Sequence, residues 1–174
     1  MTPGGGEFSL EYDGYHQIAR TVDPDGVPVD YGYDRLSRPV SVTRPENRVT
    51  RFQYDPEGNL LSRTDPLGAA RTYGYDAAGR TVRIADSQQG AVLFSYDGKG
   101  EVTSFSDELG RITQLTYDAA GQQTRSTAPD GGVHDVFYDA NGNIVRFLDP
   151  LNRAWTFAYN AVNLPQTVTD PLGR

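Results

Sequence analysis

The chain has 174 residues, of which 37% are hydrophobic, and it contains 19 glycines, 11 prolines and no cysteine. Its formal net charge is −7, and almost all of its positive charge is arginine, with Lys99 as the single lysine. An acidic chain without a basic stripe argues against nucleic-acid binding, because phosphate neutralisation dominates that affinity. The absence of an 18-residue apolar run argues against a transmembrane helix, and the absence of cysteine excludes a disulfide framework and a thiolate metal site.

The first seven residues differ in composition from the rest. Gly4, Gly5 and Gly6 favour a flexible linker over a phosphate-binding loop. The stretch also lacks the charged and apolar regions of a signal peptide. We therefore expect a linker over residues 1–7 and a single array over residues 8–174.

From residue 12 onward a tyrosine recurs every 21 residues. Aspartate follows it in seven places, and Asn160 follows the last. A fixed period of this length indicates a stacked repeat architecture. The tyrosines in phase are Tyr12, Tyr33, Tyr54, Tyr75, Tyr96, Tyr117, Tyr138 and Tyr159.

A first turn follows each tyrosine. Counting that tyrosine as position zero, aspartate at position one and glycine at position four indicate a type I turn. The first two repeats depart from the pattern, with His16 and Ser37 at position four. The aspartates could suggest paired catalytic carboxylates, but a role in bonding turn amides is favoured. The position-four glycines are Gly58, Gly79, Gly100, Gly121 and Gly142.

A second turn begins at position eleven and has the form Asp65-Pro66-Leu67-Gly68. Proline presets the first central residue, and glycine accepts a left-handed conformation at the end. In the first copy, Asp23 and Asp25 could form a calcium loop, but the glycine-rich repeat of calcium β-rolls is absent and the turn is favoured.

The stretches between the turns, such as residues 69–75 and 80–86, are rich in β-branched and aromatic residues. No segment of the chain is long enough and periodic enough to indicate a helix. Each repeat is therefore predicted to be two antiparallel strands. The fold class that follows is all-β: an antiparallel meander of about sixteen strands, two for each 21-residue repeat.

The odd period constrains the register, because side chains alternate faces along a strand. We expect a three-residue Pro-Leu-Gly loop and a four-residue loop over 76–79, so that every tyrosine stays on one face. Position five, for example Arg38 or Arg80, would then lie opposite the tyrosine and fill the gap to the next one. Positions seven and nine and the aromatic residue two before each tyrosine should share its face, whereas the polar position eight should lie on the other.

A flat sheet of this many strands would be unusual, since open twisted sheets rarely exceed about ten strands without curling. The sheet can coil into a spiral or solenoid, or pairs of repeats can form four-stranded propeller blades. The spiral is favoured because successive repeats show no long–short alternation.

The remaining candidates for a catalytic or metal-binding site are weaker. His16 and His134 occupy different phases, so a shared site is not expected, and Trp155 is expected to pack on the tyrosine face. No Ser-His-Asp order, phosphate loop or metal-ligand spacing stands out. We expect no catalysis, no cofactor and no metal.

The signature Tyr75-Asp-Ala-Ala-Gly-Arg80 with Thr64-Asp-Pro-Leu-Gly68 resembles the YD repeats of Rhs and wall-associated bacterial toxins, insecticidal toxin complexes and teneurins. The resemblance covers residues 8–174 and implies a β-spiral that winds, in longer relatives, into a hollow shell. Rhs-type and toxin-complex shells enclose a C-terminal toxin. The plug, the autoproteolytic site and the toxin domain of such shells are not recognisable here, and the array stops within its last repeat.

The resemblance implies a non-catalytic wall segment of a secreted or cell-surface bacterial protein, whose partners are the rest of the shell and its toxin. The alternative is a carbohydrate- or protein-binding β-repeat module. A saccharide hydrolase built on turn carboxylates is least favoured. Exposed edge strands predict self-association, and neither nucleic-acid binding nor membrane insertion is expected.

Overall fold

The computed structural model describes residues 7–174, and the predicted linker lies outside them apart from Glu7. It divides into two compact units, residues 1–90 and 91–174. Unit 1 contains β1 (Ser9–Tyr12), β2 (Ile18–Val22), β3 (Pro28–Tyr33), β4 (Pro39–Arg44), β5 (Arg48–Tyr54), β6 (Leu60–Thr64), β7 (Ala70–Tyr75) and β8 (Thr81–Asp86).

Unit 2 follows the same plan, and its first strand begins at Gly90, where unit 1 ends. Its strands are β9 (Gly90–Tyr96), β10 (Val102–Ser106), β11 (Ile112–Tyr117), β12 (Gln123–Thr127), β13 (Val133–Tyr138), β14 (Ile144–Leu148), β15 (Ala154–Tyr159) and β16 (Pro165–Thr169). The described part of the chain contains no helix.

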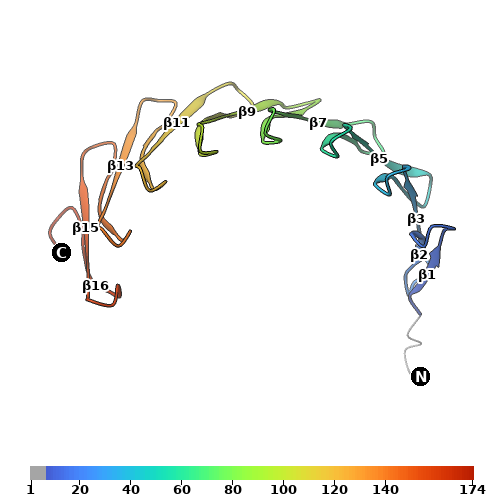
Figure 1. Cartoon of the computed structure of the whole chain (residues 1–174), viewed down its shortest axis with the longest axis horizontal. Helices are drawn as coiled ribbons and strands as arrows, with labels where there is room; N and C mark the ends of the chain where they lie inside the picture. The colour runs from blue at the N-terminus through green and yellow to red at the C-terminus, as the bar shows by residue number, and fades with distance from the viewer. Residues whose placement is uncertain (1–6) are drawn as a thin grey trace. The chain divides into compact units, whose positions relative to one another are not determined.

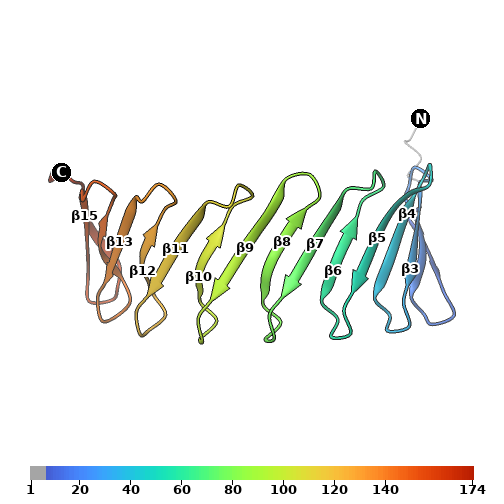
Figure 2. The same ribbon diagram turned by 90° about the horizontal axis from the view of Figure 1, so that it is seen from above.

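Within each unit every strand pairs antiparallel with its neighbours in the sequence (Figures 1 and 2). The predicted all-β meander of two-strand repeats is therefore confirmed. The four-stranded propeller blade is excluded within each unit, because pairing continues without a break from β1 to β8 and from β9 to β16. A four-stranded blade would have to end between β4 and β5 and between β12 and β13. Both of these strand pairs are hydrogen-bonded.

The sheet has two faces with different residues, as the period predicts. Tyr73, two residues before Tyr75, pairs with Ile84 at position nine, so these three share one face. Arg83 at position eight pairs with Gly74 and lies on the other face. The same pairs recur at the equivalent positions of both units.

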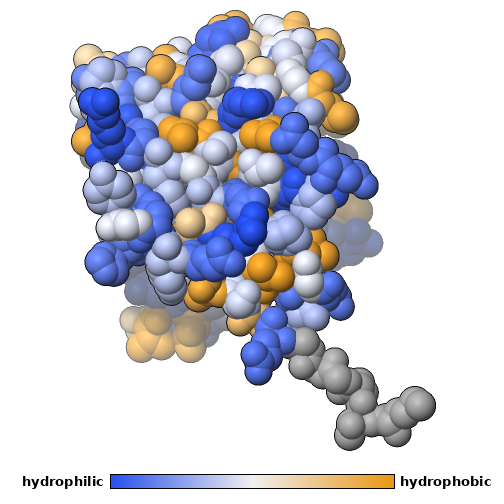
Figure 3. Space-filling view, turned by 90° about the vertical axis from the view of Figure 1, so that its right-hand side faces the viewer, coloured by the Kyte–Doolittle hydropathy of each residue, from blue (hydrophilic) through white to orange (hydrophobic). Residues whose placement is uncertain are grey.

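A thick apolar core does not form in either unit. Among residues 7–174, Ala85 is the only apolar residue that is buried, with 9% of its surface exposed. Figure 3, which views the molecule from the side of its first strands, shows hydrophobic residues scattered among hydrophilic ones. The repeats are held mainly by strand pairing, turns and contacts between adjacent repeats.

Candidate functional site

The turn after each tyrosine is closed by its aspartate. Asp76 Oδ1 accepts hydrogen bonds from the backbone N–H groups of Ala78, at 2.9 Å, and Arg80, at 3.0 Å. The Arg80 Nε–H donates to Asp76 Oδ2 at 2.7 Å. The backbone bond from Arg80 is the largest cause that lowers the pKa of the Asp76 carboxyl below its ordinary 3.8. The aspartate therefore holds the hairpin loop, as expected from the sequence.

The second turn has the same geometry. In Asp65–Ala69 the Asp65 N–H donates to the Ala69 carbonyl at 2.9 Å, and the Gly68 N–H donates to the Asp65 carbonyl at 3.0 Å. Gly68 has φ of 88°. These bonds define the predicted three-residue Pro-Leu-Gly loop, which ends in a left-handed glycine.

The predicted four-residue loop over 76–79 is wrong. Asp76 N–H donates to the Arg80 carbonyl at 3.0 Å, so that loop also has three residues. Tyr75 then pairs with Thr81 rather than Arg80, while Gly74 pairs with Arg83. One residue, Val82, is left over in a β-bulge, and this bulge absorbs the odd residue of the period.

The hydroxyls of six tyrosines of the series bond to the preceding repeat. Tyr75 Oη donates to the Leu60 carbonyl at 3.0 Å, and Tyr117 Oη donates to the Val102 carbonyl at 2.9 Å. The acceptor lies fifteen residues earlier in both cases. The other bonds of this kind join Tyr33 to Ile18, Tyr54 to Pro39, Tyr138 to Gln123 and Tyr159 to Ile144.

The reason for this bond lies in how the strands pair. The ladder between β6 and β7 ends at Ser62 and Thr72, so the Leu60 carbonyl lies beyond it. The Tyr75 hydroxyl therefore donates to a carbonyl that has no backbone partner in the β6–β7 ladder. Burial raises the pKa of the Tyr75 hydroxyl, which keeps the donor protonated. The sequence predicted that position-five side chains fill the gap between successive tyrosines, but not this carbonyl acceptor.

The side chain at position five also links repeats. The prediction that it pairs with the tyrosine of its own repeat is wrong, since Tyr75 pairs with Thr81 at position six. The Arg38 guanidinium lies over the Tyr54 ring, 4.9 Å from its centroid. Its Nη1 donates to the Asp55 carbonyl at 2.8 Å, and its Nε donates to Asp34 Oδ2 at 2.7 Å. The expected arginine–tyrosine contact is therefore present at this joint.

Other polar side chains join one tyrosine turn to the next, with partners that the sequence did not predict. Lys99 Nζ donates to the Ala119 carbonyl at 3.0 Å. Asn143 Nδ2 donates to Asn163 Oδ1 at 3.0 Å. Long or amide side chains at positions three and five were the available signal.

The opposite face has its own links between strands. Arg125 donates to Asp135 from Nε at 2.6 Å and from Nη2 at 3.0 Å. The Arg20 Nε donates to Asp30 at 2.6 Å. In both pairs the arginine side-chain hydrogen bond is the largest cause that lowers the pKa of the aspartate.

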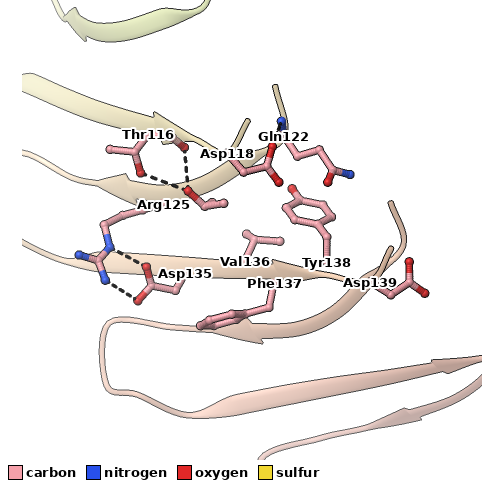
Figure 4. A pocket seen from close by; sticks show the side chains of 10 residues that line it. Thr116, Asp118, Gln122, Arg125, Asp135, Val136, Phe137, Tyr138 and Asp139 are labelled. Atoms are coloured by element: carbon pink, nitrogen blue, oxygen red, sulfur yellow. Dashed lines mark hydrogen bonds and ion pairs between the residues drawn. The ribbon is translucent and has the colours of Figure 1, made fainter. Parts of the chain in front are cut away.

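An open hollow of about 480 Å³ lies between β12 and the end of β13. Figure 4 shows Arg125 facing Asp135, with Val136 and Tyr138 on one side of the strand and Phe137 on the other. The Tyr138 hydroxyl donates to the Gln123 carbonyl at 2.9 Å. The carboxylates that line it face turn amides or an arginine, so the hollow is a gap between repeats that the tyrosine partly fills.

The remaining candidates lie in structural environments. Asp23 Oδ1 accepts from the N–H groups of Asp25 and Val27, which is a turn. His16 takes the left-handed turn position with φ of 63°. His134 stacks on Phe147, whose ring contacts Trp155, both at 5.6 Å between centroids.

Residues 7–174 contain no group of three or more potential metal-binding side chains. No helix in that same stretch could span a membrane.

Comparisons with known proteins agree with this geometry. The chain is similar to the Photorhabdus luminescens Tc holotoxin pore, with 14% identity over 93% of this chain and a TM-score of 0.65. It is also similar to the TcdB2-TccC3 complex with Cdc42, with 15% identity over 97% of the chain and a TM-score of 0.56. The chain spans about 12% of the length of these structures. No curated protein matches the sequence.

The family comparison covers most of the chain. The RHS Repeat model matches residues 12–49, 33–70, 54–91, 96–133 and 138–174. Each matched stretch begins at one of the tyrosines of the 21-residue series. This chain belongs to the RHS repeat family.

Proposed function

We propose that this array is a non-catalytic wall segment of a longer, secreted or surface-displayed bacterial protein that encloses or presents a C-terminal toxin. The observation that carries the proposal is the bond from the tyrosine hydroxyl to the preceding repeat, as in Tyr117 with Val102. Such a bond gives successive repeats the same connection to their neighbours. A wall needs this uniformity, whereas a catalytic site needs one exceptional place.

The state of the acidic side chains supports the same role. Asp76 and Asp107 each accept two backbone N–H groups and an arginine Nε–H. Carboxylates bound in this way stay ionised and fixed, which suits a turn and not proton transfer. The solved structures that share the fold include a Tc holotoxin pore and TcdB2-TccC3, one of the latter without its hypervariable C-terminal region.

Limited proteolysis of the complete protein that carries the array tests this role. The C-terminal domain should resist protease in the unaltered protein and become cleavable when Tyr75→Ala and Tyr117→Ala open two joints. Tyr15→Ala is the control, because Tyr15 is 86% exposed and out of phase. A C-terminal domain that is cleaved equally fast in all three proteins would contradict the proposal.

A binding module is the second candidate, and one place in unit 2 favours it. Phe137 is exposed, with the Arg146 guanidinium 5.6 Å from its ring centroid, beside the hollow near Arg125. An aromatic face next to planar polar groups suits a glycan. A glycan array should then give hits that Phe137→Ala removes, and an array without hits would eliminate this candidate.

A further inference from the structure

Two arginines lie directly opposite each other in the middle of the sheet of unit 1, Arg63 on β6 and Arg71 on β7. Residues paired in this way share a face, and Tyr73, two residues after Arg71, places both of them on the tyrosine face. Both arginines are exposed. Like charges directly opposite each other destabilise an antiparallel sheet, so this pair weakens the fold unless an anion neutralises it.

The acidic residues beside the pair do not neutralise it. Among residues 7–174 neither Arg63 nor Arg71 forms an ion pair, whereas seven other arginines of that stretch do. Asp86 lies opposite Arg71, and Asp65 follows Arg63 by two residues on the same strand face. The Oδ1 atoms of both aspartates accept hydrogen bonds from backbone N–H groups of their own turns. The two guanidinium groups are therefore left to bind another anion.

The arginine pair is an exception within the array. It occupies positions nine and seventeen, and at five equivalent joints the paired residues include no two charged side chains. The pairs at those joints are Thr21 with Val29, Val42 with Thr50, Phe105 with Thr113, Ser126 with His134 and Phe147 with Trp155. A uniform wall does not require this exception, so a role for the pair is independent of the wall role.

The charge around the pair favours a compact anion over an extended one. Residues 35–83 contain nine arginines and five acidic residues, although the whole chain has a net charge of −7. The positive charge is therefore local. A nucleic acid laid along the sheet would meet Asp65, Asp86 and the acidic remainder of the chain, which oppose the phosphate neutralisation on which its binding depends. A single anionic group between the two arginines avoids these carboxylates.

We propose that Arg63 and Arg71 together bind one phosphate monoester. A guanidinium group donates two parallel hydrogen bonds to an oxyanion, and a single arginine already engages both oxygens of a carboxylate. A phosphate monoester has three acceptor oxygens and a charge of about −2, which match two arginines. Phe52 lies opposite Arg63 on the same face and offers an apolar surface to the organic part of the ester.

A titration with phenyl phosphate, followed by phosphorus NMR at constant ionic strength, tests the site. The unaltered chain should bind the probe saturably, and Arg71→Thr should raise the Kd at least about tenfold, because one of two charged donors is lost. Threonine already occupies this position at Thr50 and Thr113, so the sheet accepts it. Arg51→Thr is the matched control and should leave the Kd unchanged. Arg51 is exposed, forms no ion pair in the described part of the chain, and lies opposite Ser41 on the other face.

Thermal unfolding separates loss of the site from loss of the fold. Without a ligand, Arg71→Thr should raise the unfolding midpoint, because it removes the repulsion between like charges. Phenyl phosphate should raise the midpoint of the unaltered chain more than that of Arg71→Thr. The proposal would be overturned by the absence of saturable binding, by an equal loss of binding in Arg51→Thr, or by tighter binding of a polyglutamate peptide or a single-stranded oligonucleotide than of phenyl phosphate.

Discussion

The hydroxyl of Tyr75 donates a hydrogen bond to the backbone carbonyl of Leu60, 3.0 Å away. The bond crosses from one repeat to the one before it, at a point where the ladder between β6 and β7 has already ended. A phenylalanine would fill the same space but leave the carbonyl without this donor. The tyrosine of the repeat is therefore required for its hydroxyl as well as for its ring.

Removing the Tyr75 hydroxyl should destabilise the contact between the two repeats. We expect Tyr75→Phe to lower the free energy of unfolding by about 1 kcal/mol, because one hydrogen bond is lost and a partly buried carbonyl is left unpaired. Urea unfolding followed by circular dichroism measures the change. Tyr15→Phe, at an exposed turn position, should change it by less than about 0.5 kcal/mol, and equal effects at both sites would contradict the assignment.

Glycine should be the most stable residue at the left-handed position of the turn, so replacing glycine there should destabilise the fold and introducing glycine should stabilise it. Gly79 has φ of 75°, and a Cβ added there would meet nothing within 4 Å, so Gly79→Ala tests conformation alone. It should cost about 1–2 kcal/mol. Ser37, with φ of 66°, is the reverse case, and Ser37→Gly should stabilise by at most about 1 kcal/mol. Thermal unfolding of the two variants should shift in opposite directions.

Acid should weaken the turns. Backbone hydrogen bonds lower the pKa of Asp76 and Asp107 below 3.8, with the N–H groups of Arg80 and Arg111 as the largest causes. The stabilisation is therefore present above the unfolded-state pKa near 4 and is lost as pH falls through the lower folded-state values. Unfolding monitored between about pH 6 and 2 should show this loss.

A matched variant isolates the acid effect. Asn160 already replaces the aspartate in the last repeat and accepts from the N–H groups of Val162 and Leu164. Asp76→Asn should therefore keep the loop closed while removing one titrating group. Its stability should fall less steeply with acid than that of the unaltered chain, and an unchanged slope would rule out Asp76 as a contributor.

Alkaline pH should break the hydrogen bonds that the Tyr75 and Tyr117 hydroxyls make to the preceding repeats. Burial is the largest cause that raises the pKa of Tyr75 and Tyr117 above 10.0. Their stabilisation is present below pH 10 and is lost as pH rises through the folded-state values, because the ionised phenol cannot donate. Absorbance at about 295 nm should show these two groups ionising above pH 10, together with the loss of strand signal.

The sequence predicts the strands, both aspartate turns and the two faces, because each depends on local residue choice at a fixed phase. The bulge at Val82 could not be predicted, since a longer loop and a bulge absorb the same extra residue and leave Tyr75 on the same face. The acceptor at Leu60 depends on where a ladder between two strands ends, which no local pattern reveals. The sequence identifies the tyrosines, but their partners follow only from the three-dimensional structure.

Ala85 is the only buried apolar residue that unit 1 and unit 2 contain within residues 7–174. Most face positions can therefore exchange one side chain for another without leaving a void, whereas the turn aspartates and left-handed glycines allow few replacements. Evolutionary drift should accumulate on the faces and spare the turns. The same architecture can therefore persist at low sequence identity, as it does at 14% identity and a TM-score of 0.65.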